Sequence, residues 1–172
     1  EKTVLKVIER CPNISEPSVY LHLYQALPKG SKMEFIIQKA VELGVSEITP
    51  VLTSRCIVRL TPEAFEKKRE RYQKIAKEAA KQSGRGIIPK VNPLLYYTDA
   101  LKTLEKDNSI IFYECGGAPL RELVNLEQKQ ISFFVGSEGG FSLDEINMAE
   151  ENGAQVASLG SRILRCETAP IC

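Results

Sequence analysis

The spacing of hydrophobic positions at the start of the chain predicts β-structure. Apolar and polar residues alternate at Val4–Ile8 and again at Val19–Tyr24, and this period of two is typical of half-buried strands. The segment Pro12–Pro17 between them is rich in Pro, Asn, Ser and Glu, which predicts a connecting loop. Because this pattern differs from that of the remaining chain, we expect residues 1–25 to belong to a separate small β domain.

A helical spacing replaces the alternation after residue 30. Ser31 and Glu34 have the spacing of a capping box, and Gly44 supplies a helix end. Between them apolar residues recur at intervals of three and four, which predicts an amphipathic helix. Its apolar face comprises Met33, Ile36, Ile37, Ala40, Val41 and Leu43.

From Ile48 onwards short apolar runs alternate with helical segments. A strand is expected at Ile48–Leu52, and Thr61 followed by Pro62 marks the start of a long helix that continues to Ser83. This alternation predicts an α/β domain with a parallel sheet. The remaining expected elements are strands at Ile87–Val91, Ser109–Tyr113, Ile131–Val135 and Gln155–Leu159 and helices at Asp99–Glu105 and Leu143–Asn152.

Composition narrows the classes of function. The chain has 23 Lys and Arg against 22 Asp and Glu, so any basic surface for nucleic acid must come from local clustering. Five scattered cysteines lack paired spacing, which indicates free thiols in a reducing compartment. With His22 as the only histidine, no His-based metal site or catalytic triad is expected. No apolar run approaches the roughly 20 residues of a membrane span, so we expect a cytoplasmic protein without membrane contact.

The segment Phe133–Ser142 combines a strand end, a glycine-rich turn and a helix start. Gly136, Gly139 and Gly140 surround the carboxylate of Glu138. Glycines let a backbone approach a ligand closely, although they also serve simply to make tight turns. The sequence lacks both the phosphate-loop pattern and an early G-x-G-x-x-G, so ordinary nucleotide-binding motifs fit poorly.

Three glycine-containing loops follow predicted strands, at Tyr113–Gly117, Gly136–Gly140 and Leu159–Arg165. In parallel α/β sheets, ligands bind outside the carboxyl ends of the strands. Any one loop alone is well explained as a tight turn, whereas the three together indicate a shared ligand site. In the last loop Arg162 and Arg165 flank two aliphatic residues. We interpret them either as solvated surface arginines or, with the Glu-Thr pair that follows, as part of a polar site.

Four sequence blocks resemble the ribosomal RNA small-subunit methyltransferase E family. Leu27–Gly30 followed by Ile36–Val45 is similar to the start of the family's catalytic domain, and Glu78–Arg85 is similar to its central motif. Gly136–Phe141 and Leu159–Ala169 resemble its two cofactor-loop motifs. The blocks lie in the family's order and cover most of the chain, and the last one is long and specific.

The resemblance implies a SPOUT-type fold, in which a parallel sheet is flanked by helices and the C-terminal part forms a trefoil knot. It implies a homodimer that uses S-adenosylmethionine to methylate the ring N3 of a uridine in 16S ribosomal RNA, in an assembled or nearly assembled subunit. The family also carries an N-terminal PUA-like β domain, of which only the end is expected in residues 1–25. Residues 26–172 then form the methyltransferase domain. Two alternatives stay open: a SPOUT methyltransferase for another RNA such as transfer RNA, and a non-catalytic RNA-binding relative.

The sequence departs from the family's pattern in two places. Ser137 stands where the family usually has proline, although the neighbouring glycines and Glu138 are retained. The family also continues beyond the position of Cys172 into a helix that completes the knot and packs in the dimer. That helix is expected to be missing from these residues.

The resemblance also assigns roles to individual residues. Arg165 and Arg162 are expected to stabilise the anion that develops on the uridine ring. For Glu138 several roles stay open: proton acceptor, anchor of the nucleoside, ligand of the cofactor ribose, or a group that orders the loop. No metal is expected.

Backbone groups of the three loops are expected to hold the cofactor, with Leu159, Ile163 and Leu164 beside its adenine. The RNA contacts are expected to be phosphate contacts from basic side chains, whereas the Lys67–Arg71 run is interpreted as a solvated helix face. The expected cofactor contacts are Tyr113, Glu114, Gly116, Val135, Gly136, Gly139, Gly140, Leu159, Gly160, Ile163, Leu164 and Thr168, and the expected RNA contacts are Lys29, Arg55, Arg59, Lys81 and Arg85.

Overall fold

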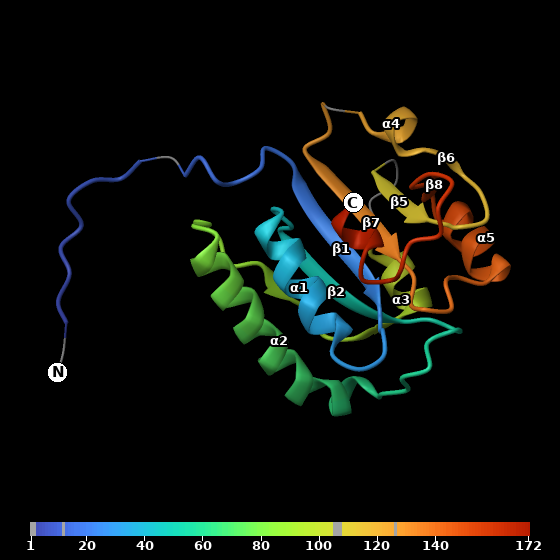
Figure 1. Cartoon of the computed structure of the whole chain (residues 1–172), viewed down its shortest axis with the longest axis horizontal. Coiled ribbons are helices and arrows are strands. Elements are labelled where there is room, and N and C mark those ends of the chain that lie inside the picture. Colours follow the sequence, from blue (N-terminus) through green and yellow to red (C-terminus); the bar gives the residue numbers. More distant parts are fainter. Residues whose placement is uncertain (1–2, 12, 105–107, 126) are drawn as a thin grey trace.

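Strands and helices alternate along the chain and build one parallel sheet covered on both faces (Figure 1). The computed structural model describes residues 3–11, 13–104, 108–125 and 127–172. In the described residues the strands are β1 Tyr20–Ala26, β2 Glu47–Leu52, β3 Lys90–Val91, β4 Leu95–Tyr96, β5 Ser109–Phe112, β6 Ala118–Pro119, β7 Gln130–Val135 and β8 Gln155–Ser158. The helices are α1 Lys32–Glu42, α2 Pro62–Gln82, α3 Tyr97–Lys102, α4 Leu120–Leu123, α5 Leu143–Glu151 and the 3-10 turn η1 Ala169–Ile171.

The strand order is β3-β2-β1-β7-β5-β8-β6, with β4 also pairing with β2, and every described pair is parallel. The expected parallel α/β domain is therefore confirmed. A parallel pair needs a crossover between its strands: α1 connects the paired strands β1 and β2, and α2 connects the paired strands β2 and β3. All the strands consequently have their carboxyl ends at the same edge of the sheet.

Alternation along β1 distributes its side chains between two cores. Leu23 is fully buried with residues of α1 and α2, including Ile36 and Phe65. The next residue, Tyr24, packs on the opposite face with residues of α3 and α5 and stacks on Phe134 of β7 at 4.4 Å. Because successive strand residues point to opposite faces, this one strand joins both helical layers.

The N-terminal part of the sequence interpretation needs correction. Val4–Ile8 is not a strand, and its apolar side chains are exposed, with Val4 at 91%. The segment has no partner strand among the described residues, so alternation alone could not form one. The strand expected at Val19–Tyr24 exists as β1, yet it lies at the centre of the main sheet and pairs with β2 and β7. It is therefore not part of a separate β domain; that a PUA-like domain precedes it stays a prediction.

The predicted helix starts have different outcomes. The capping box of Ser142 and Glu145 is confirmed, since each side chain bonds to the other residue's backbone N–H. The one predicted at Ser31 is wrong: the Ser31 side chain makes no cap bond, and Glu34 instead pairs with Arg71 of α2 at 2.8 Å. Two surface helices thus gain a link, while α1 begins without a side-chain cap.

Other boundaries shift by a few residues. The strand expected at Ile87–Val91 shortens to Lys90–Val91. The helix expected at Asp99–Glu105 runs from Tyr97 to Lys102, and Glu105 lies outside the described residues. The sequence interpretation missed β4, β6, α4 and η1, because elements of two to four residues carry no detectable period.

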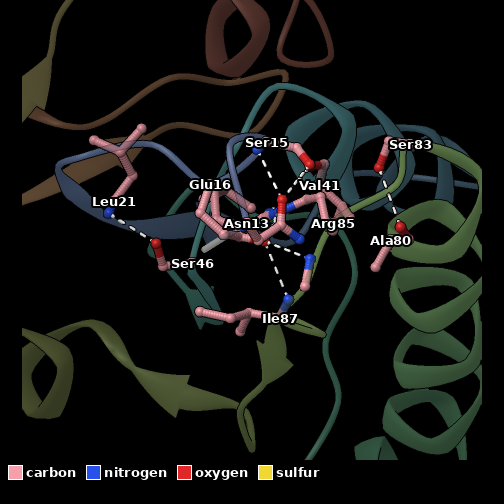
Figure 2. Close-up of polar contacts among 12 residues, drawn as sticks. Asn13, Ser15, Glu16, Leu21, Val41, Ser46, Ala80, Ser83, Arg85 and Ile87 are labelled. Carbon is pink, nitrogen blue, oxygen red and sulfur yellow. Dashed lines mark hydrogen bonds and ion pairs between the residues drawn. The ribbon is translucent and has the colours of Figure 1, made fainter. Parts of the chain in front are cut away.

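A buried ion pair fastens the segment before β1 to the domain (Figure 2). The Arg85 side chain is 2% exposed, and it pairs with Glu16 at 2.7 Å. Its Nη1 also donates to Val41 O at 3.1 Å and to Val45 O, which satisfies carbonyls at the end of α1. Glu16 in turn accepts the backbone N–H groups of Gly86 and Ile87. The tie therefore joins the amino-terminal segment, the α1–β2 turn and the α2–β3 loop.

Among the helices in the described part of the chain, none combines the length and the apolar character that crossing a membrane requires.

Glu16→Gln is expected to lower the free energy of unfolding by about 1–3 kcal/mol at neutral pH, because it leaves a buried guanidinium without its anion. The hydrogen bond from Arg85 holds the pKa of Glu16 below its ordinary value. The ion pair therefore stabilises the fold at neutral pH, and this stabilisation is lost as the pH falls through the folded-state pKa.

Urea unfolding of the unmodified chain and of Glu16→Gln, at about pH 7 and about pH 3, measures this free energy. The difference in free energy of unfolding between the two proteins should shrink at the lower pH. Glu9→Gln, in the exposed N-terminal segment, is the control and should unfold like the unmodified chain. A Glu16→Gln deficit of the same size at both pH values would contradict the interpretation.

Candidate functional site

A cavity of about 410 Å³ opens at the carboxyl-terminal edge of the sheet. Its walls are the loops that follow β5, β7 and β8, together with the first residue of α1 and the segment around η1. The sequence predicted this convergence, since ligand sites in parallel sheets lie at this edge. The lining residues are Lys32, Phe112, Tyr113, Glu114, Val135, Gly136, Ser137, Glu138, Gly140, Ser158, Leu159, Gly160, Arg162, Ile163, Leu164, Arg165, Cys166 and Ala169.

The glycine turn after β7 is closely packed on itself. Gly140 has a φ of +64°, and its N–H donates to Ser137 O at 3.0 Å. A side chain at Gly136 would lie 3.0 Å from the Gly140 Cα, and one at Gly140 would clash with the Glu114 carboxylate. Glycine is therefore required here for both backbone conformation and space. As a result the wall of the cavity at this point is bare backbone.

Ser137 is buried within the same turn. The residue is 6% exposed, and its Oγ has no hydrogen-bond partner among the described residues. The turn nevertheless keeps its closing backbone bond, and Glu138 and the glycines keep their places. The replacement of the family's usual proline by serine is therefore compatible with this loop.

A four-residue charged cluster joins different parts of the cavity wall. Lys32 Nζ lies 3.0 Å from Glu138 Oε1 and 3.2 Å from Glu167 Oε2. These two hydrogen bonds raise the pKa of Lys32 to about 12. Burial raises the pKa of the Cys166 thiol to about 12, so the thiol stays protonated and donates to Glu167 at 3.2 Å. The Cys166 and Lys32 contacts together hold the pKa of Glu167 below its ordinary value.

Glu138 is held from two sides. Besides the Lys32 ammonium, its carboxylate accepts the backbone N–H of Lys29 at 3.1 Å. Partial burial acts to raise the pKa of Glu138, but these hydrogen bonds outweigh it and the pKa lies below its ordinary value. Such a carboxylate is a weak proton acceptor and a strong loop anchor.

Arg162 and Arg165 both line the cavity and are exposed. Among the described residues neither guanidinium has an ion-pair or hydrogen-bond partner, whereas Arg85 and Arg71 are both paired. The segment that carries them is irregular rather than helical. Two unpaired cationic groups that line a cavity can bind an anion or stabilise developing negative charge.

Most of the expected site residues meet at this cavity. Nine of the twelve expected cofactor contacts and all three expected catalytic residues line the cavity. The exceptions are Gly116, Gly139 and Thr168. Residues that sequence reasoning missed are Lys32, Phe112, Ser158, Cys166 and Ala169, whereas Ser137 lies within a loop expected to hold the cofactor. Phe112 and Ser158 are strand ends next to the expected loops and could have been found by extending them.

The expected RNA contacts separate into two groups. Lys29 and Arg55 adjoin the glycine turn, since Arg55 Nη1 donates to Gly139 O at 3.1 Å. Arg59 bonds to the carbonyls of Thr53 and Ser54, in the loop after β2.

Lys81 and Arg85 lie near the amino ends of the strands, away from the cavity. Lys81 remains exposed and pairs with Glu78 at 2.8 Å. The expectation that Arg85 contacts RNA is wrong, because its guanidinium is buried in the ion pair with Glu16.

Comparisons with known proteins find relatives over nearly the whole chain. The model of an RNA methyltransferase domain matches residues 15–172. The ribosomal RNA small subunit methyltransferase E of Bacillus subtilis is 35% identical over 179 residues, which cover 99% of this chain and 70% of that protein. The same-named protein of Mesomycoplasma hyopneumoniae is 37% identical over 96% of this chain and 72% of its own length.

A solved structure shows the same relationship. The ribosomal RNA small subunit methyltransferase E of Neisseria gonorrhoeae, bound to S-adenosyl methionine, is 38% identical with a TM-score of 0.84. The match covers 91% of this chain, which spans 64% of that chain. Since sequence and fold agree over nearly all of its residues, the chain belongs to the ribosomal RNA small-subunit methyltransferase E family.

Proposed function

We propose that this protein transfers a methyl group from S-adenosylmethionine to the ring N3 of a uridine in 16S ribosomal RNA. One observation carries the proposal: two arginines without a partner among the described residues border a cavity of mixed apolar and polar lining at the carboxyl edge of the sheet. The relatives named above are ribosomal RNA methyltransferases, and the gonococcal one holds the methyl donor. The assignment to uridine N3 and to 16S ribosomal RNA rests on the family resemblance.

The cavity residues fit such a cofactor. A volume of about 410 Å³ lies within the range of small-molecule sites. Phe112, Leu159 and Leu164 supply apolar surface for an adenine, and the glycine turn supplies backbone polar groups. Ser137 adds a buried hydroxyl that has no partner of its own among the described residues.

The bound cofactor would supply an electrophilic methyl group, and the uridine N3 would lose its proton to solvent water as the new N–C bond forms. The protein's task is therefore to position the acceptor and to stabilise the anion that develops on the uridine. In the proposal Arg165 and Arg162 do the latter, because no other group of the described residues neutralises them. The paired state of Glu138 favours loop ordering over proton acceptance. Lys29, Arg55 and Arg59 then contact the RNA near the cavity, and Lys81 contacts it further away.

The proposal also covers the cellular location, the oligomeric state, the substrate particle and the C-terminal topology. The protein acts in the cytoplasm as a homodimer on an assembled or nearly assembled small subunit, and its C-terminal part forms a knot. The non-catalytic alternative is less well supported, because Arg162 and Arg165 line a cavity of the size of a small-molecule site, which binding of RNA alone does not require.

Gly140→Ala is expected to weaken S-adenosylmethionine binding by roughly tenfold or more, because the added methyl displaces the Glu114 carboxylate into the cavity and strains a positive φ. Isothermal titration calorimetry on the full-length protein measures this. Gly84→Ala is the matched control, since it has a φ of +70° but open space around it and lies away from the cavity. It should lose stability without losing cofactor affinity. Failure of the unmodified protein to bind the cofactor would contradict the proposal.

Arg165→Ala is expected to lower the rate of methyl transfer about 100-fold, because a fixed cation at the developing charge is lost. Glu138→Gln should raise the cofactor dissociation constant and leave the pH dependence of turnover unchanged. Labelled methyl incorporation into RNA measures the turnover of both variants and its pH dependence, and calorimetry measures the cofactor dissociation constant. Arg71→Ala on the surface of α2 is the control. Near-normal turnover in both variants would remove these residues from the mechanism, and an altered pH profile in Glu138→Gln would restore the proton-acceptor role.

The substrate is tested by mapping methylated uridines in RNA from cells with and without the gene. We expect loss of one N3-methylated uridine from 16S ribosomal RNA, and faster methylation of small-subunit particles than of transfer RNA by the purified protein. Binding should fall steeply with added salt if phosphates dominate the contacts. Methylation confined to transfer RNA would instead support the alternative substrate.

A further inference from the structure

Lys32 joins two loops of the cavity that are far apart in the sequence. It is the first residue of α1, and its ammonium contacts Glu138 on the glycine turn and Glu167 just beyond the arginine loop. It also donates toward Cys166 Sγ at 3.8 Å. A single cation therefore links the turn after β7 to the segment that follows Arg165.

We propose that Lys32 is a positioning residue that holds the arginine-bearing loop against the glycine turn and so shapes the cavity for its ligand. The identity of that ligand, S-adenosylmethionine, rests on the proposed function. The positioning itself rests only on contacts within this chain.

The geometry shows what the cation counteracts. The oxygens of Glu138 and Glu167 contact the same nitrogen at 3.0 and 3.2 Å, so the two carboxylates lie close together. Without Lys32 they would face each other as like charges, which favours either separation of the loops or protonation of one carboxylate. The two loops carry Gly140 and Arg165 respectively, so separation would change the cavity itself.

The cluster is otherwise well anchored, so loss of Lys32 should not unfold the protein. Glu138 keeps the Lys29 N–H and Glu167 keeps the Cys166 thiol as hydrogen-bond partners. The titratable groups that face Lys32 are Glu138, Cys166 and Glu167. The remaining charged groups of the cavity wall, Glu114, Arg162 and Arg165, form no ion pair with it in the described structure.

The test compares S-adenosylmethionine binding by the full-length protein and its Lys32→Gln variant at about pH 8 and about pH 5.5. We expect the variant to bind roughly tenfold more weakly at the higher pH. The ratio of the two dissociation constants should shrink to within about threefold at the lower pH, because protonating one carboxylate removes the repulsion. Lys39→Gln, which removes a 2.8 Å ion pair with Glu42 on the same helix, is the control and should bind normally.

A second variant distinguishes repulsion from simple loss of a side chain. Adding Glu167→Gln to Lys32→Gln leaves one carboxylate in the cluster, so the double variant should recover most of the lost affinity at the higher pH. Hydrogen exchange of backbone amides 137–141 and 161–168, measured without cofactor, should be faster in Lys32→Gln and return toward normal in the double variant.

Normal affinity and normal exchange in Lys32→Gln would overturn the inference. So would a loss of affinity that is equal at both pH values and is not rescued by the second substitution. If the unmodified protein binds no S-adenosylmethionine, the proposed function fails instead, and the exchange measurements alone decide the role of Lys32.

Discussion

Parallel pairing of β1 with β2 and β7 is the constraint on which the rest of the structure depends. It places β1 between the next strand along the chain and a strand from its last third, and it gives both helical layers a common surface through Leu23 and Tyr24. Parallel strands bring their carboxyl ends to one edge. The start of α1 and the glycine turn consequently become neighbours, although neither segment carries a signal for the other. The cavity is a result of this pairing and not of any single motif.

Local signals in the sequence predicted local structure well. The Ser142 and Glu145 capping box, the long helix after Thr61 and the alternation of the longer strands and helices are confirmed, because each depends on residues a few positions apart. The three cavity loops were found for the same reason. Two of the failures have their cause in distance along the chain. Val4–Ile8 has the right alternation but no partner strand in the described structure, and Lys32 acquires its role only through carboxylates that follow β7 and β8.

Charge has two different uses in this protein. Arg85 belongs to a sequence block whose family resemblance suggested RNA contact. Its charge is instead neutralised by Glu16 in an ion pair in which the Arg85 side chain is buried. Arg162 and Arg165, for which the residues alone left open a surface or a site role, line the cavity and are unpaired in the described structure. Which arginines are available to a ligand is therefore decided by neighbours from other elements, and composition near electrical balance carries no information about it.

The ion pair between Glu16 and Arg85 also fixes the position at which the chain enters the domain. It lies at the amino ends of β1 and β2, whereas the cavity lies at their carboxyl ends. A strand of seven residues such as β1 spans about 23 Å. An RNA that touched both residues 3–11 and the cavity would have to cross the sheet along its whole strand length. Recognition at the amino ends of the strands and chemistry at the cavity would thus act on nucleotides about one strand length apart in the folded RNA.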